Sequence, residues 1–158
     1  MMPDLKILYL TRDPLTTAIS FYNRNKFFEK DNFKLNFKKN IFKINELDLF
    51  EKYLWIWIEI KLRLIDLQEK YNIDIIHFKS ENIDNLDSLK KLFFDLDLKY
   101  DNLEIQTRLN TNKLAGFNET QINNFFLDKF ENFKNKIPSN IKKKIPEFLN
   151  YDQIQNFI

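Results

Sequence analysis

Three residue types that often carry chemistry are scarce in this sequence. Its 158 residues include no cysteine, one glycine and one histidine. Without cysteine there is no disulfide framework, thiol nucleophile or thiolate metal site, and we expect a protein of the reducing cytoplasm. A single glycine leaves no glycine-rich loop to surround a phosphate. Without cysteine or a second histidine, we also predict no metal site.

Long apolar runs and an excess of one charge are absent as well. The most apolar stretch, residues 53–67, is interrupted by Glu59, Lys61, Arg63 and Asp66, and it is shorter than the roughly 20 residues that span a bilayer. The N-terminus lacks the pattern of a signal peptide. Lysine and arginine number 25 against 23 acidic residues, a net charge of +2. This balance argues against a nucleic-acid-binding arm or an acidic tail.

Core-forming residues are plentiful. Hydrophobic residues make up 44% of the chain and 17 residues are phenylalanine, which is enough to bury a core. The length suits one domain, and we predict a single domain over residues 1–158.

The first half of the chain has an alternating strand and helix pattern. Residues 6–11 form a short apolar run that predicts a buried strand. Asp13 can cap a helix that starts at Pro14 and runs to about Arg24. Apolar residues at helical spacing predict a helix over residues 46–71, with Asn72 as its stop, and a second strand over residues 73–78. A strand, a helical crossover and a strand indicate a parallel α/β arrangement, whose carboxyl ends hold Arg12 and residues 79–81.

The second half is predicted to be helical. A short amphipathic helix is expected over residues 84–96, with its inward face formed by Leu86, Leu89, Phe93 and Leu96. Asn118 and Gln121 resemble a capping box for a helix that ends at about Lys136. Ser139 can cap another helix, which Pro146 interrupts. Residues 26–43 mix phenylalanine with lysine and asparagine without a clean period, and either pack on the body as an acceptor-site or surface loop, or stack on single-stranded nucleic acid.

Arg12 and Ser20 are the first candidate binding residues. A guanidinium at the end of a strand can hold a phosphate through two parallel hydrogen bonds. Ser20 lies roughly 9 Å along the following helix from Pro14, within reach of an arginine and a phosphate. Thr16 and Thr17 stand in the first helical turn, where backbone N–H groups also favour an anion. The alternative is that Arg12 pairs with a surface carboxylate and Ser20 faces solvent.

Residues 6–24, Lys-Ile-Leu-Tyr-Leu-Thr-Arg-Asp-Pro-Leu-Thr-Thr-Ala-Ile-Ser-Phe-Tyr-Asn-Arg, resemble the 3′-phosphate-binding motif of sulfotransferases that use 3′-phosphoadenosine 5′-phosphosulfate (PAPS). That motif has a strand, an Arg, Asn or Asp, Pro, and a Ser eight residues after the Arg. The resemblance implies that Arg12 and Ser20 hold the 3′-phosphate of the cofactor. It also implies a P-loop-nucleotide-hydrolase-like parallel sheet with helical crossovers, with a family-like core in residues 1–100 of a partial sulfotransferase-like domain and a helical C-terminal part in residues 101–158.

A second stretch is similar to a later part of the same family. Residues 73–98 follow the order of the family's strand, its Arg-Tyr-Glu-Asp-Leu-like element and its helix ending in Phe-Leu-Gly-Leu. The chain departs from that pattern at three positions: Ser80 replaces an aromatic residue, Asn82 an acidic residue and Asp97 a glycine. Arg108 and Lys113 fall where the family often has a late basic stretch near the nucleotide phosphates, and we include them as cofactor-binding candidates.

The family's loop around the 5′-phosphosulfate, a Pro-Lys-Ser/Thr-Gly-Thr-type element, has no counterpart here, because the one glycine is Gly116. The family's base precedes the 3′-phosphate motif, so no catalytic residue is assigned. His77, the one histidine, falls within a predicted strand and is expected to be structural. We expect the chain to be the carboxyl-terminal part of a sulfotransferase whose amino-terminal part is missing or lies on another polypeptide, which leaves a sheet edge for a partner chain.

The resemblance implies transfer of a sulfuryl group from PAPS to a hydroxyl or amine, with PAPS or adenosine 3′,5′-bisphosphate as ligand. The acceptor cannot be read from the sequence. The alternative is a non-catalytic binding module of the same fold that binds a phosphorylated or nucleic-acid partner.

Overall fold

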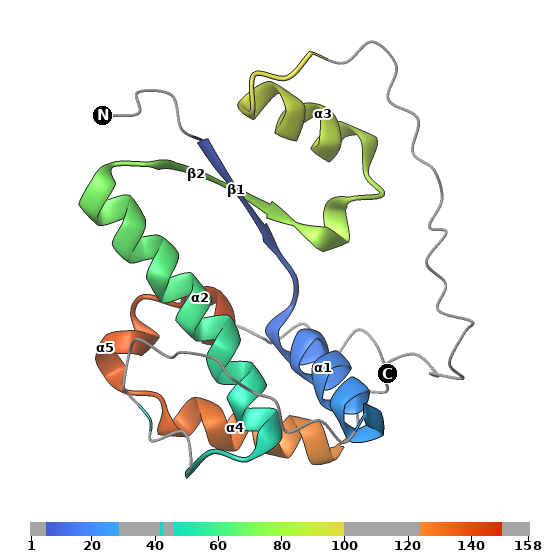
Figure 1. The fold of residues 1–158 in the computed structure, drawn as a ribbon, viewed down its shortest axis with the longest axis vertical. Helices are drawn as coiled ribbons and strands as arrows, with labels where there is room; N and C mark the ends of the chain where they lie inside the picture. The colour runs from blue at the N-terminus through green and yellow to red at the C-terminus, as the bar shows by residue number, and fades with distance from the viewer. Residues whose placement is uncertain (1–5, 29–41, 43–45, 100–123, 150–158) are drawn as a thin grey trace. The chain divides into compact units, whose positions relative to one another are not determined.

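The computed structural model describes residues 6–28, 42, 46–99 and 124–149, and these residues form a mixed α/β structure (Figure 1). The chain divides into two compact units. The first unit comprises Met1–Arg12 and Leu64–Glu119, and the second comprises Asp13–Arg63 and Thr120–Ile158.

The first unit contains a parallel pair of strands, β1 (Lys6–Thr11) and β2 (Asp74–Lys79). Their register places Lys6 opposite Asp74 and Thr11 opposite Lys79. The Thr11 hydroxyl donates a hydrogen bond to the Phe78 carbonyl oxygen at 3.3 Å, which joins the carboxyl ends of the two strands. The predicted parallel strand–helix–strand arrangement is therefore confirmed, with β2 starting one residue later than expected.

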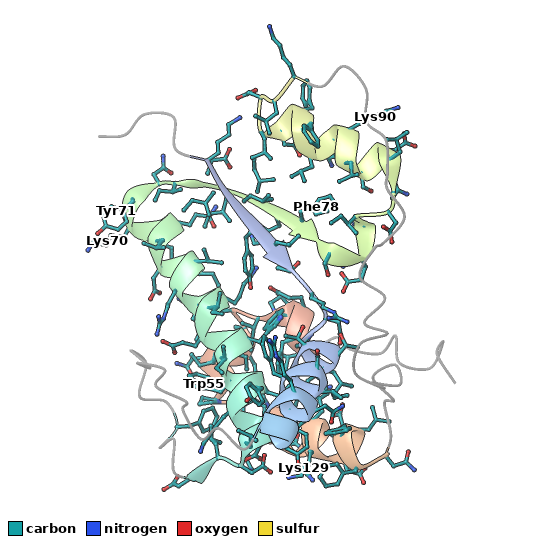
Figure 2. The ribbon with its side chains drawn as sticks, turned by 45° about the vertical axis from the view of Figure 1, so that its right-hand side comes forward. Trp55, Lys70, Tyr71, Phe78, Lys90 and Lys129 are labelled. Atoms are coloured by element: carbon teal, nitrogen blue, oxygen red, sulfur yellow. The ribbon has the colours of Figure 1, made fainter. Side chains whose placement is uncertain are left out.

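The prediction that β1 is a buried strand is wrong. Leu8 is 43% exposed and Leu10 is 56% exposed, whereas Ile75 and Phe78 of β2 are buried. The helix α3 (Leu86–Asp95) packs against β2, and Figure 2 labels Phe78 on that strand. An apolar run shows that its residues favour burial, but the elements that pack on a strand decide which side chains lose water.

The second unit is a helical cluster around one hydrophobic core. It contains α1 (Pro14–Phe28), α4 (Asn124–Lys136), α5 (Ser139–Lys142), α6 (Pro146–Leu149) and most of α2 (Leu49–Tyr71). Trp55 of α2 is 1% exposed and points into this core (Figure 2). The other side chains that are completely buried come from four of the helices and the turn before α6, and they are Leu15, Ala18, Ile19, Phe50, Leu54, Ile58, Phe130, Phe133, Ile145 and Phe148.

Side chains near the helix ends explain where α1 and α2 begin and end. Asp13 Oδ1 accepts the Thr16 N–H at 2.6 Å, so Asp13 is the N-cap of α1 as predicted. This helix continues four residues beyond the expected Arg24. The helix α2 begins at Leu49 instead of residue 46 because Asp48, directly before the helix, forms a capping box with Glu51 of its first turn. Asn72 has a φ of 50° and ends α2, as predicted.

The later helices agree in part with the sequence. The helix expected over residues 84–96 is α3, with Asn85 as its cap, and α4 ends at Lys136 as predicted. The prediction for Ser139 is wrong, because Pro138 occupies the cap position and Ser139 is the first residue of α5. The helical segment is interrupted before Pro146 as predicted, because α5 ends at Lys142 and a separate helix, α6, starts at Pro146. A proline at the first helical position sacrifices no hydrogen bond. The start predicted from Asn118 and Gln121 lies outside the described residues.

Candidate functional site

Arg12 lies directly after β1 and is exposed. Because Thr11 is opposite Lys79 in the parallel register, Arg12 and Lys79 lie at the same end of the two-stranded sheet. The 3₁₀ turn Ser80–Asn82 follows there and carries Glu81, which is also exposed. The predicted grouping of Arg12 with residues 79–81 at the carboxyl ends of the strands is therefore confirmed. Two cationic side chains and one acidic side chain at one sheet end form a polar site within the first unit.

Ser20 lies in the second turn of α1, on its exposed side. This helix belongs to the second unit, whereas Arg12 belongs to the first. The helix turns its apolar positions into the core, where Leu15, Ala18 and Ile19 are buried. The helical period then leaves Ser20 in solvent, with its hydroxyl available to a ligand.

The first turn of α1 is already occupied by its own cap. The Thr16 N–H donates to Asp13 Oδ1 at 2.6 Å, and the Thr17 N–H donates to the Asp13 carbonyl oxygen at 3.0 Å. The Thr16 hydroxyl also donates to that carbonyl oxygen. Because the Asp13 carboxylate stands where an anion would gain most from the helix N-terminus, the structure does not support a role for the Thr16 and Thr17 backbone amides in binding a phosphate.

The end of α3 explains one departure from the sulfotransferase pattern. The Leu98 N–H donates to the Phe93 carbonyl oxygen and the Asp97 N–H to that of Phe94, which is the bonding of a Schellman motif. Asp97 has a φ of 56°, in the region that glycine adopts most readily. Asp97 therefore takes the conformation for which a glycine is suited, and its side chain makes a contact that glycine would lack.

That contact joins the helix end to β1. Lys6 Nζ donates to the Asp95 carbonyl oxygen at 2.8 Å and to the Asp97 carboxylate at 2.5 Å. The hydrogen bond to Asp97 raises the pKa of Lys6. The lysine thus satisfies a carbonyl group and opposes the negative end of the α3 dipole. The sequence gives little indication of this contact, since Lys6 and Asp97 are 91 residues apart.

His77 lies within β2 as predicted, but its side chain is exposed. Its ring makes an edge contact with Tyr9, the residue opposite it in β1, at 5.5 Å between centroids. This position in mid-strand keeps His77 away from the end of the sheet that carries Arg12 and Lys79. The predicted position of His77 within a strand is confirmed, and its structural role stays a prediction.

Two acidic side chains are buried in the second unit, and sequence reasoning missed both. Glu59 is 3% exposed, and its Oε1 accepts from Arg63 Nε at 2.9 Å. Glu51 is 6% exposed, completes the capping box with Asp48 and pairs with Lys136. The available signal was the spacing of Asp48 and Glu51, which matches a capping box, and the four-residue spacing of Glu59 and Arg63.

The remaining sequence candidates lie largely outside the described residues. These include Arg108 and Lys113 as well as most of the phenylalanine- and lysine-rich residues 26–43. In the parts of the chain that the structure describes, no three His, Asp or Glu side chains gather as ligands for a metal ion. Within the same parts, no helix has the length and apolar character to cross a membrane.

The chain matches no protein-family model, no curated protein and no solved structure. The resemblance to sulfotransferases therefore depends on the motif residues alone.

Proposed function

We propose that this chain binds the 3′-phosphate of PAPS or of adenosine 3′,5′-bisphosphate and serves a PAPS-dependent sulfotransferase. One observation carries the proposal: an arginine lies between the end of a strand and a capped helix, and an exposed serine follows in that helix. The order along the chain is β1, Arg12, Asp13, Pro14 and Ser20. The structure supports it in three local respects: β1 ends directly before Arg12, α1 begins at Pro14, and Ser20 is exposed.

The proposed fold is a P-loop-like parallel sheet. Its support is the parallel pairing of β1 and β2, with α1 and α2 between them in the sequence. Open parallel sheets bind ligands beyond the carboxyl ends of their strands. Arg12 and Lys79 stand at such an end, where two positive side chains favour an anionic ligand.

The proposed roles follow from the chemistry of the two side chains. The Arg12 guanidinium presents parallel N–H donors that match two oxygens of a phosphate. The Ser20 hydroxyl can also donate a hydrogen bond to a phosphate oxygen, and neither group has to change its protonation state. Both roles concern holding the nucleotide. The sulfuryl transfer also needs a base for the acceptor hydroxyl or amine, and we assign that base to no residue.

Calorimetric titration of the full chain with adenosine 3′,5′-bisphosphate and with 5′-AMP tests this function. We expect tighter binding of the bisphosphate, because only this ligand carries a 3′-phosphate. Arg12→Ala and Ser20→Ala should each remove that preference, since each removes a hydrogen-bond donor to the phosphate. Ser139→Ala, which replaces another exposed serine near a helix start, is the matched control and should bind as the wild type does.

Equal affinity for the two nucleotides in the wild type would overturn the proposal. In that case, binding of phosphorylated peptides or single-stranded nucleic acid by the same protein would favour the alternative of a non-catalytic binding module. The absence of cysteine is consistent with a cytoplasmic setting for either function.

A further inference from the structure

The exposed side of α1 carries an arginine one helical turn after Ser20. Ser20 and Arg24 are separated by four residues, and both are exposed. On a helix, residues at this spacing are neighbours, with about 5–6 Å between their Cβ atoms. The two side chains therefore share one face of the second unit, which is opposite to the buried Leu15, Ala18 and Ile19.

The direction of helical side chains brings the arginine towards the serine. In an α-helix the Cα–Cβ bonds tilt towards the N-terminus, and long side chains extend over the preceding turn. At this spacing the guanidinium of Arg24 can extend over the turn that holds Ser20. An anion that accepts the Ser20 hydroxyl lies within the reach of this guanidinium.

Neither side chain has a partner within the described residues. No hydrogen bond or ion pair joins the Ser20 hydroxyl or the Arg24 guanidinium to any side chain that the structure describes. Arg63, the other arginine of the second unit, contacts the Glu59 carboxylate at 2.9 Å through both Nε and a terminal nitrogen. Within the residues that the structure describes, no other side chain uses the parallel N–H donors of Arg24.

The donors for an anion on α1 must come from side chains beyond the first turn. The cap formed by Asp13 uses the Thr16 N–H, and its carboxylate places negative charge at the helix N-terminus. Ser20 and Arg24 lie in the following turns, further from that carboxylate. A phosphate with two negative charges gains more there from a guanidinium than from a hydroxyl alone.

We propose that Arg24 is a further ligand of the nucleotide's 3′-phosphate and acts together with Ser20. This inference rests on the proposed function, and it assigns a residue that the strand–Arg–Asp–Pro–Ser pattern does not contain. Arg24 donates hydrogen bonds to the phosphate and takes no part in bond breaking.

Calorimetry of the full chain tests the assignment. Arg24→Gln should weaken the binding of adenosine 3′,5′-bisphosphate by about tenfold or more, because a hydrogen bond to a charged group is lost. The affinity for 5′-AMP should not change. Arg24→Lys should recover only part of the affinity, since lysine keeps the charge but loses the parallel donors. Lys143→Gln removes an exposed positive charge elsewhere in the second unit and should bind as the wild type does.

The outcomes separate this inference from the function on which it rests. If Arg12→Ala and Ser20→Ala lose the preference for the bisphosphate while Arg24→Gln keeps it, the role of Arg24 is overturned and the proposed function remains. If the wild type does not prefer the bisphosphate, both are overturned. Thermal unfolding of each variant shows whether a loss of affinity reflects a loss of folded protein.

Discussion

Asp48 and Glu51 exchange hydrogen bonds at the start of α2: Asp48 Oδ1 accepts the Glu51 N–H at 2.9 Å, and Glu51 Oε2 accepts the Asp48 N–H at 3.2 Å. Each carboxylate also pairs with a lysine of α4, Asp48 with Lys129 and Glu51 with Lys136. The two lysines are seven residues apart and lie on one side of α4. One capping box therefore joins the start of α2 to two turns of another helix of the second unit.

Because of the capping box, the free energy of unfolding should fall at acidic pH. Partial burial by itself would raise the pKa of Asp48, but hydrogen bonds from Lys129 and from the Glu51 N–H outweigh burial and lower it. Because the folded pKa is lowered, the stabilisation is complete above the unfolded pKa of about 4 and is lost as the pH falls through the folded value. Urea unfolding between pH 3 and 7 measures this loss.

Asp48→Asn is the informative variant, since it keeps a cap but cannot titrate. It should lose less stability than the wild type as the pH falls from about 5 to 3. Asp128→Asn removes an exposed aspartate of α4 and should follow the wild type. Parallel pH curves for wild type and Asp48→Asn would contradict the prediction.

Thr17 should tolerate loss of its hydroxyl. Its Oγ1 is buried and has no hydrogen-bond partner among the described residues. A buried hydroxyl without a partner costs about 1–3 kcal/mol of desolvation, so Thr17→Val, which keeps the shape, should raise the free energy of unfolding by about 1 kcal/mol. Chemical unfolding at neutral pH measures the difference, with Thr17→Ser as the variant that keeps the hydroxyl. A clear loss of stability in Thr17→Val would show that the hydroxyl is satisfied.

Variants at Asp97 distinguish the effect of its backbone conformation on stability from the effect of its ion pair with Lys6. Asp97→Gly and Asp97→Ala both remove the contact with Lys6, but only glycine adopts a φ of 56° without steric cost. We expect Asp97→Gly to be more stable than Asp97→Ala by about 1 kcal/mol in chemical unfolding. Equal stabilities would mean that the end of α3 rearranges when the aspartate is removed.

Replacing only one partner of the Glu59–Arg63 ion pair should destabilise the protein. Glu59 is buried, and Arg63 lies one turn further along α2. Arg63→Met removes the guanidinium and should lower the free energy of unfolding by about 3 kcal/mol, because it leaves a buried carboxylate without this counter-charge. The double variant Glu59→Leu/Arg63→Met removes both charges and should recover much of that loss. A double variant no more stable than Arg63→Met would show that Glu59 is held by other contacts.

Much of the secondary structure could be predicted because its signals are local. Asp13 and Pro14 start α1, Asn72 ends α2, and the apolar period of α2 identifies its buried face. These features depend on residues within one or two turns of each other. Ser139 shows the limit of such reasoning, because a serine before a helix can be the cap or the first helical residue, and the backbone of Pro138 decides between them.

The candidate site was predictable in part for the same reason. The grouping of Arg12 with Lys79 follows from two parallel strands, which the sequence indicated. The Asp13 cap was predicted, but its competition with an anion at the first turn of α1 was not foreseen. The pairing of Arg63 with Glu59 was also not foreseen, although both features are local. A pattern shows which side chains are near one another, but it does not show which polar groups are already used.

The sequence by itself determined the order of the strands and helices, the C-terminal end of α2 and the positions of Arg12 and Ser20 relative to β1 and α1, because those features arise between residues close in the chain. Only the tertiary structure decided that Leu8 and Leu10 are exposed, that Glu51 and Glu59 are buried, and that Lys6 holds the end of α3. The physical reason is that exclusion of water depends on which distant segments pack together, and contacts between residues tens of positions apart leave little trace in local composition.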